Sequence, residues 1–118
     1  MSELTLGQKQ RLFVRLLPRL IDFAYSSGYE LTIGDGYRDP RVHGAMGVKI
    51  GYSHPSSNHK QRLAIDFNLF KGGVFLQATE DHKPLGEFWE SLHPLCKWGG
   101  RLTPADGNHY SIWHGGMV

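Results

Sequence analysis

The first periodic segment of the chain has apolar residues at steps of three and four, which is the spacing of one face of an α-helix. These residues are Leu6, Phe13, Leu16, Leu17, Leu20, Phe23 and Ala24. Thr5, followed three residues later by Gln8, has the pattern of a capping box, and Gly28 is a natural stop. We therefore predict a helix between them. Pro18 lies inside the pattern and should kink this helix or split it in two.

A different periodicity follows in residues 63–69, where apolar and polar positions alternate as in a half-buried strand. The apolar face carries Leu63, Ile65, Phe67 and Leu69, and the other face carries Ala64, Asp66 and Asn68. Residues 29–33 are expected to form an earlier strand, residues 74–76 to pair back through a glycine turn, and residues 109–113 to form a last short strand. Asp66 is thus predicted to point away from the core.

A second helix is predicted for residues 79–95, because Leu85, Phe88, Trp89 and Leu92 form an apolar face. Thr79 or Asp81 is expected to cap its start, and Pro84 fits its first turn. Together these elements predict an α+β fold, in which two or three helices pack on one small, mainly antiparallel sheet. The other face of the sheet is left open for a site.

The connection between residues 37 and 57 is long and rich in glycine, and contains at most a short helical turn near residues 40–46. Loops of this length in a small domain are functional or disordered. We expect residues 39–56 to be mobile without substrate and to form one wall of a cleft. Tyr52 either lines that cleft or caps the loop, and His54 either contacts substrate or is an ordinary surface histidine.

From the length of 118 residues we expect one domain, residues 1–118, without a separate binding module. The net charge of +2 neither demands nor excludes a polyanion, and we expect a monomer with no nucleic-acid partner. No apolar run is long enough for a membrane span, and basic residues interrupt any signal-peptide core, so neither membrane insertion nor an export signal is expected. We interpret the lone Cys96 as a small, buried hydrophobic residue of a protein made in a reducing compartment.

His59 is the first candidate metal ligand. It lies in the loop before the predicted strand, so its side chain can swing to the side on which Asp66 lies. An imidazole and a carboxylate form a normal partial shell for zinc, although a solvated histidine and a strand-edge carboxylate would have the same spacing. His109 from the last strand would complete the site. His114 lies on the opposite face of that strand, so it joins the site only if the strand bends.

Asp106 lies three residues before His109, and Gly107 and Asn108 between them permit a tight turn. Its carboxylate can fold back beside the metal without binding it, which is the position of a general base. Two histidines and one carboxylate would hold Zn²⁺ with an open position, and the free carboxylate would take a proton from water and pass it to the leaving amine.

These residues resemble the zinc D,L- and D,D-peptidases of the M15 type, which include VanX- and VanY-like enzymes and the L-alanyl-D-glutamate endopeptidase endolysins of bacteriophages. The motif positions that match are Ser57, His59, Ala64, Asp66, Asp106 and His109. Trp98-Gly99-Gly100 and an aspartate as base resemble the endolysin branch in particular. Arg62 stands where the motif has glycine, and Asn108 where proline or tryptophan is common.

The resemblance implies that Arg38, in Gly36-Tyr37-Arg38, steadies the substrate carbonyl or the oxyanion. Ser57 would orient a ligand or the substrate, and Tyr37 is a further candidate for substrate contact. The implied function is hydrolysis of a stem-peptide bond of peptidoglycan, L-Ala-D-Glu, with Zn²⁺ as cofactor. The enzyme would be made in a bacterial host's cytoplasm and act on the wall after release across the inner membrane. A D,D-carboxypeptidase is the nearest alternative, and a non-catalytic, zinc-stabilised virion or binding module is an alternative of another class.

Overall fold

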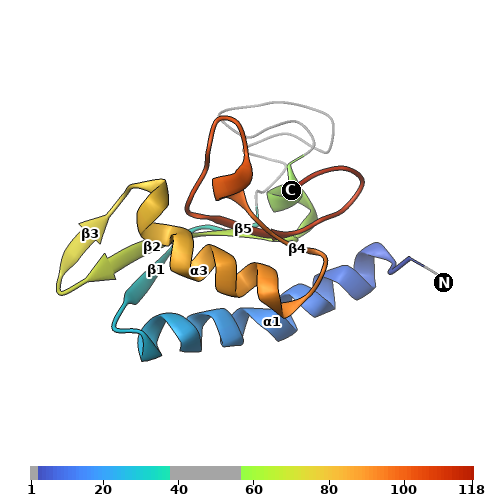
Figure 1. The fold of residues 1–118 in the computed structure, drawn as a ribbon. Coiled ribbons are helices and arrows are strands. Elements are labelled where there is room, and N and C mark those ends of the chain that lie inside the picture. The colour runs from blue at the N-terminus through green and yellow to red at the C-terminus, as the bar shows by residue number, and fades with distance from the viewer. Residues whose placement is uncertain (1–2, 38–56) are drawn as a thin grey trace.

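An antiparallel sheet carries both long helices on one of its faces (Figure 1). The computed structural model describes residues 3–37 and 57–118. In chain order the elements are α1 (Leu6–Ser26), β1 (Glu30–Asp35), the 3-10 helix η1 (Asn58–Gln61), β2 (Ala64–Lys71), β3 (Val74–Leu76), α3 (Thr79–Leu92), β4 (Cys96–Trp98), the 3-10 helix η2 (Gly99–Arg101) and β5 (His109–Ile112). The predicted α+β class, with helices on a small antiparallel sheet, is confirmed.

The sheet has the order β1-β2-β5-β4, and β3 pairs with β2 beside this path. All the pairings are antiparallel. Residues 64–66 of β2 pair with β5, whereas residues 69–71 pair with β3. β5 and β3 therefore share β2 as a partner at different points along its length, with a gap near residues 67 and 68.

The core lies between the sheet and the two helices, as the alternation in β2 predicted. Its buried members include Phe13, Leu16, Leu20, Leu63, Ile65, Phe67, Leu69, Leu85, Trp89, Tyr110 and Ile112. Phe13 of α1 meets Trp89 of α3 edge to face, with ring centroids 5.9 Å apart. Because the apolar residues of β2 face the helices, the side chain of Asp66 projects from the opposite face.

Helix α1 begins at the predicted capping box. The Thr5 side chain accepts from the backbone N–H of Gln8, and the Gln8 side chain accepts from that of Thr5. Of the two effects predicted for Pro18, a split is wrong, because α1 is one helix across it, and a kink stays a prediction. Pro18 and Val14, whose carbonyl loses its helical partner, both lie on the exposed side, where water can hydrogen-bond that carbonyl.

Helix α3 is shorter than predicted and ends at Leu92, since Pro94 disfavours a helical conformation at His93. Its N-cap is Ala78, and the Asp81 carboxylate accepts from the Ala78 N–H at 3.2 Å. Pro84 lies inside the helix rather than in its first turn. No helix within residues 3–37 and 57–118 has the length and apolar character to cross a membrane.

The turn between β2 and β3 follows the prediction, with Gly72 and Gly73 both at positive φ. Strand β4 was not predicted, because three residues are too short to show a period. Cys96 begins this strand and is buried, and burial raises the pKa of its thiol to about 12. The predicted helical turn at residues 40–46 and the proposed mobility of residues 39–56 lie outside the described residues.

Candidate metal and catalytic site

The pairing of β2 with β5 brings the first two candidate ligands together. Asp66 lies directly opposite His109 in the register of these strands. Opposite residues of an antiparallel pair have their side chains on the same face. The Nδ1 atom of His109 is accordingly 3.3 Å from Oδ1 of Asp66.

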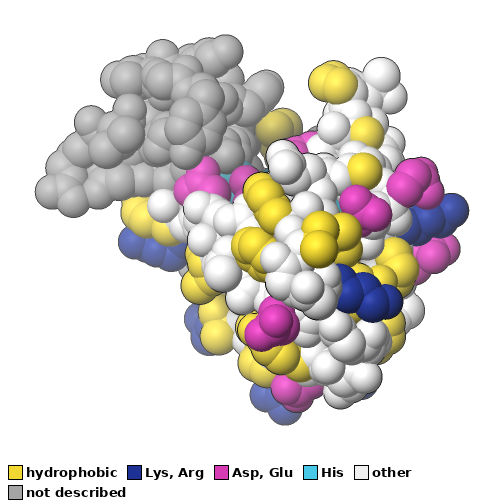
Figure 2. Space-filling model, turned by 90° about the vertical axis from the view of Figure 1, so that its left-hand side faces the viewer, with side chains coloured by type: hydrophobic (Ala, Val, Ile, Leu, Met, Phe, Trp, Pro, Cys, Tyr) yellow, Lys and Arg dark blue, Asp and Glu magenta, His cyan; other side chains and the backbone are white. Residues whose placement is uncertain are grey.

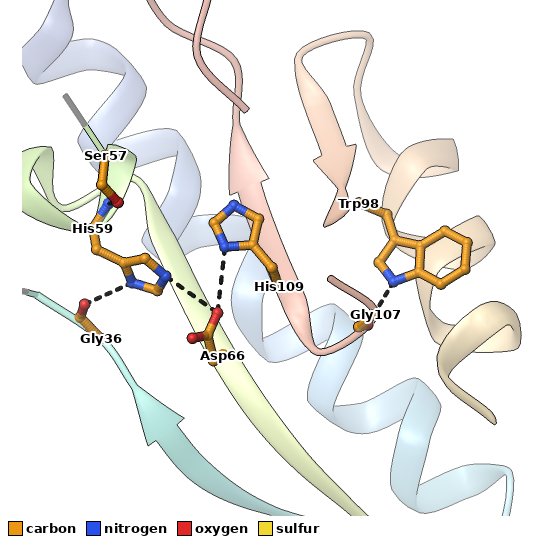
Figure 3. Close-up of polar contacts among 7 residues, drawn as sticks. All are labelled: Gly36, Ser57, His59, Asp66, Trp98, Gly107 and His109. Atoms are coloured by element: carbon orange, nitrogen blue, oxygen red, sulfur yellow. Dashed lines mark hydrogen bonds and ion pairs between the residues drawn. The ribbon is translucent and has the colours of Figure 1, made fainter. Parts of the chain in front are cut away.

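His59 reaches the same carboxylate from η1. Ser57 is the N-cap of this helix, and its Oγ accepts from the backbone N–H of His59 at 3.2 Å. The buried amide of Asn58 donates to the carbonyls of Ile112 and Met117, both at 3.0 Å, and so fixes η1 to the end of β5. These contacts leave the His59 ring over the sheet, with Nε2 at 3.1 Å from Asp66 Oδ1 (Figure 3).

The proton on His59 is placed by a backbone carbonyl. Its Nδ1 lies 2.8 Å from the oxygen of Gly36, which can only accept, so Nδ1 carries the hydrogen and donates it. Nε2 faces Oδ1 of Asp66 at 3.1 Å, so it contacts the carboxylate as a hydrogen-bond donor when it is protonated and can serve as a metal ligand when it is not. A backbone carbonyl behind the outer nitrogen is the usual support of a metal-binding histidine.

The dimensions of the group fit zinc. One ligand atom from each of His59, Asp66 and His109 lies within 4.8 Å of the others. Bonds of about 2.0–2.1 Å in a tetrahedral zinc site place neighbouring ligand atoms roughly 3.3 Å apart, and the two histidine nitrogens lie 3.1 and 3.3 Å from the carboxylate oxygen. Nitrogen and oxygen donors in this combination suit zinc, and three protein ligands leave an open position.

The carboxyl of Asp66 is held in its anionic form. Burial opposes its ionisation, but hydrogen bonds from His109 and His59, together with the attraction of both rings, outweigh burial and hold its pKa well below the usual value. The Nε2 atom of His109 is buried and has no hydrogen-bond partner among the described residues. The polar contact of this ring is therefore made through Nδ1, toward Asp66.

Asp106 lies at the start of a tight turn that leads into His109. Its backbone N–H donates to Gly99 at 2.9 Å, and its carbonyl accepts from His109 at 3.2 Å. The side chain is exposed, and it is not a member of the group that can hold a metal. The role of Asp106 as a base beside the metal remains a prediction.

Trp98 holds this turn in a way that the sequence interpretation missed. Its indole N–H donates to the carbonyl of Gly107 at 2.7 Å in a buried bond, as Figure 3 shows. The ring lies against Gly86 and Gly100, where a Cβ atom at either position would overlap it. The Trp98-Gly99-Gly100 sequence was the signal that could have indicated this arrangement. Nothing in the sequence identified Gly107 as the partner of the indole N–H.

We expect Trp98→Phe to destabilise the protein by about 1–3 kcal/mol, because the buried carbonyl of Gly107 loses its donor. Since that carbonyl belongs to the turn between Asp106 and His109, kcat should also fall. Trp89→Phe is the matched control, because Trp89 donates a comparable buried bond to Ser111 at 3.0 Å. Urea denaturation and kcat measured on both variants check this. An equal fall of kcat in the two would show that Trp98 has no special link to the turn.

Arg62 stands where the family motif has a glycine, and it keeps the backbone conformation that a glycine would adopt there. The residue has a left-handed backbone, with φ of 58°, which is the conformation that glycine adopts most easily. Its guanidinium lies 4.0 Å from the ring centre of Tyr37. This stacking contact joins the residue after η1 to the residue after Gly36, whose carbonyl holds His59.

Arg62→Gly is expected to change the free energy of unfolding by less than about 1 kcal/mol, because the relief of the left-handed conformation offsets the lost cation–π contact. Arg62→Val should lower it by roughly 1–3 kcal/mol, since a β-branched residue fits this conformation poorly. Thermal unfolding of both variants measures the difference. Equal losses would mean that backbone strain is not what matters at this position.

The remaining candidates are distributed as follows. Ser57 is buried at the N-cap of η1, and Tyr37 is partly exposed beside Arg62. Arg38, Tyr52 and His54 lie outside the described residues. His114, considered as a supplementary ligand, contacts the buried Lys9 through Nδ1 at 3.1 Å and is not a member of the metal-binding group.

Comparisons with known proteins identify the family of the chain and a similar fold. A family model described as D-alanyl-D-alanine carboxypeptidase, of the M15 peptidases, matches residues 51–112, just over half of the chain. The crystal structure of the Serratia marcescens L-Ala D-Glu endopeptidase ChiX has a similar fold, with a TM-score of 0.60 and 18% identity. The similarity covers 91% of this chain and 85% of that one. None of the curated protein sequences matches this chain significantly.

Proposed function

Because the chain belongs to the M15 peptidase family described as D-alanyl-D-alanine carboxypeptidase, we propose that it is a zinc-dependent hydrolase of the stem peptides of peptidoglycan. Family membership makes the chain a peptidase. Three further points are proposed: that the metal is zinc, that the substrate is the cell wall, and which bond is cut. Of the stem-peptide bonds, we propose L-Ala-D-Glu as the one that is cut.

The observation that carries the proposal is the convergence of His59, Asp66 and His109 on the open face of the sheet. These positions are the ones that the M15 motif assigns to the metal. Two nitrogens and one carboxylate oxygen would hold zinc there. When bound, zinc supplies a Lewis acid that lowers the pKa of water to about 7 and polarises a carbonyl.

The chain's own residues would then carry the proton. In peptide hydrolysis the water oxygen forms a bond to the carbonyl carbon, the C–N bond breaks, and the leaving nitrogen must gain a proton. Asp106 takes the proton from water and delivers it to that nitrogen. The exposed position of its side chain at the turn before His109 supports this role. Arg38 would stabilise the developing oxyanion.

The choice of bond rests on sequence features of the endolysin branch. Trp98-Gly99-Gly100 and an aspartate as base resemble the endopeptidases, and the structure gives Trp98 a contact with the turn that carries this base. The family description names a carboxypeptidase instead, so D,D-carboxypeptidase activity is the second candidate. A non-catalytic zinc module is the alternative of another class, although a closed structural site has no need of Asp106.

The setting that we propose follows the resemblance to phage endolysins. The protein would act as a monomer, without a nucleic-acid partner or membrane insertion. It would be made in the cytoplasm of the host bacterium and reach the wall after the inner membrane is opened. The substrate would be the peptide part of the wall.

The test is lysis of purified cell walls by protein whose metal content is known. We expect lysis by the zinc-loaded protein, none after dialysis against a chelator, and recovery when one equivalent of zinc is returned. Circular dichroism on each sample checks that the fold survives removal of the metal. Zinc-loaded protein that stays folded and leaves walls and free stem peptides intact would point to the non-catalytic module.

A further inference from the structure

An open pocket of about 250 Å³ lies in the gap between the two partners of β2. Its walls are β3 with Gln77, the start of α3, and residues 105–108. Figure 2 views the molecule from the side of the β2–β3 hairpin that borders this pocket. The gap is bridged by a hydrogen bond of 3.0 Å from the N–H of Phe67 to the carbonyl of Asn108.

The pocket is adjacent to the proposed catalytic residues but separate from the metal ligands. Asp106 is one of its lining residues, whereas none of the three metal-binding residues is. Asn68, which also lines it, is on the same face of β2 as Asp66 and two residues farther along, a distance of about 7 Å in a strand. A substrate that extends along β2 from the metal past Asp106 therefore enters this pocket.

Most of the polar lining is uncharged. Besides Asp106 it consists of Gln77, Thr79, His82, Asn108 and Asn68, whose side-chain N–H also donates to Thr32 Oγ1 at 3.2 Å. Amides and a hydroxyl of this kind donate to and accept from peptide groups. Such a lining suits a polar peptide better than an apolar side chain.

His82 contributes an imidazole ring that a buried contact holds in place. Its Nδ1 is 2.8 Å from the phenol oxygen of Tyr110, in a buried bond. Burial lowers the pKa of His82, only partly opposed by Asp81, so the ring is neutral and carries one hydrogen. With the phenol as donor to Nδ1, that hydrogen lies on Nε2. A carbonyl or carboxylate oxygen of a bound peptide is the matching acceptor.

We propose that this pocket, the amine-side pocket, binds the part of the substrate that leaves with the new amino group. The inference rests on the proposed function, in which Asp106 protonates the leaving nitrogen. The residue that carries this nitrogen must lie against Asp106, and the amine-side pocket is the space next to it. The ligand class is a polar peptide with a free amino terminus, held by hydrogen bonds from the uncharged side chains.

Gln77→Trp tests the pocket, because Gln77 is exposed and an indole there would occupy the space. Val74→Trp is the matched control, since Val74 is exposed at the opposite end of β3 and does not line the pocket. The probes are the dipeptide D-γ-Glu-L-Lys for the amine side and N-acetyl-L-alanine for the carboxyl side. Binding to the zinc-loaded protein is followed by NMR titration, and melting temperatures confirm that both variants fold.

We expect Gln77→Trp to weaken binding of D-γ-Glu-L-Lys by about tenfold or more, and Val74→Trp to change it by less than about twofold. Binding of N-acetyl-L-alanine should be equal in all three proteins. With a stem peptide as substrate, KM should rise in Gln77→Trp while kcat stays within about threefold. Gln77→Ala, a milder change, should weaken the dipeptide by a smaller factor in the same direction.

Three outcomes would overturn the amine-side pocket: no binding of the dipeptide to wild-type protein, equal binding in Gln77→Trp, or equal weakening of both probes by that variant. Because the titration needs no turnover, it separates this inference from the proposed function. Walls left uncut by a protein that binds the dipeptide in this pocket would reject the hydrolase. Walls cut by a protein with unaltered binding in Gln77→Trp would reject only the pocket.

Discussion

Asp106→Asn is expected to reduce kcat by roughly two to four orders of magnitude, the usual contribution of a positioned general base. The amide can still hydrogen-bond water, but it cannot accept a proton or return one to the leaving nitrogen. The backbone bonds of this turn, from Asp106 to Gly99 and from His109 to Asp106, do not involve the carboxylate. The fold and the metal content should therefore be unchanged.

The measurement compares zinc content, melting temperature and wall lysis on one preparation of Asp106→Asn and one of wild type. Near-normal lysis would place the base elsewhere in the chain. Loss of zinc would make Asp106 a ligand and would require the role of Asp66 to be reconsidered. Asp22→Asn, a change at an exposed acidic residue of α1 outside the metal-binding group, is the control that should keep normal lysis.

His59→Ala, Asp66→Ala and His109→Ala should each lose most of the bound zinc and, with it, the activity. Three ligands are the minimum for an open catalytic site, so each removal leaves only two protein contacts. Metal analysis after dialysis gives the result directly. His93→Ala is the control, because His93 ends α3 away from the group and should leave the stoichiometry at wild-type level. Full zinc in all three ligand variants would disprove the assignment.

Asp66→Ala has a second expected consequence that distinguishes it from the histidine variants. Its carboxylate lies 3.1 Å from His59 and 3.3 Å from His109, so its removal leaves both rings without their shared partner. Imidazole rings can protonate and turn toward water, whereas each histidine variant leaves the half-buried carboxylate of Asp66 with one histidine contact fewer. At low zinc the stability of the three variants, followed by urea denaturation, should therefore differ even where their metal loss is the same.

Local periodicity was sufficient to predict the elements on which the site is built. The alternation in residues 63–69 placed Asp66 on the open face, and the capping box and Gly28 bounded α1 correctly. The glycine turn after Lys71 formed as expected. These features succeed because each depends on residues that are neighbours in the sequence.

The parts that could not be predicted depend on contacts between distant segments. Nothing near Trp98 in the sequence indicates that its N–H meets the carbonyl of Gly107, and β4 exists only because β5 pairs with it. The carbonyl of Gly36 that orients His59 comes from the residue after β1, more than twenty positions earlier in the chain. The effect of Pro18 was predicted from its place in the helix pattern alone. In the structure Pro18 lies on the exposed side of α1, and the helix continues through it.

The most direct test of the central claim is mass spectrometry of peptidoglycan fragments after digestion with the zinc-loaded protein. The proposed activity predicts peptides with a new amino-terminal D-Glu, together with sugar-linked fragments that end in a free L-Ala carboxyl. Both products should form roughly two to four orders of magnitude more slowly when Asp106→Asn replaces wild type at the same concentration. Loss of a single terminal D-Ala would identify a D,D-carboxypeptidase instead, and unchanged stem peptides would contradict the assignment as a wall peptidase.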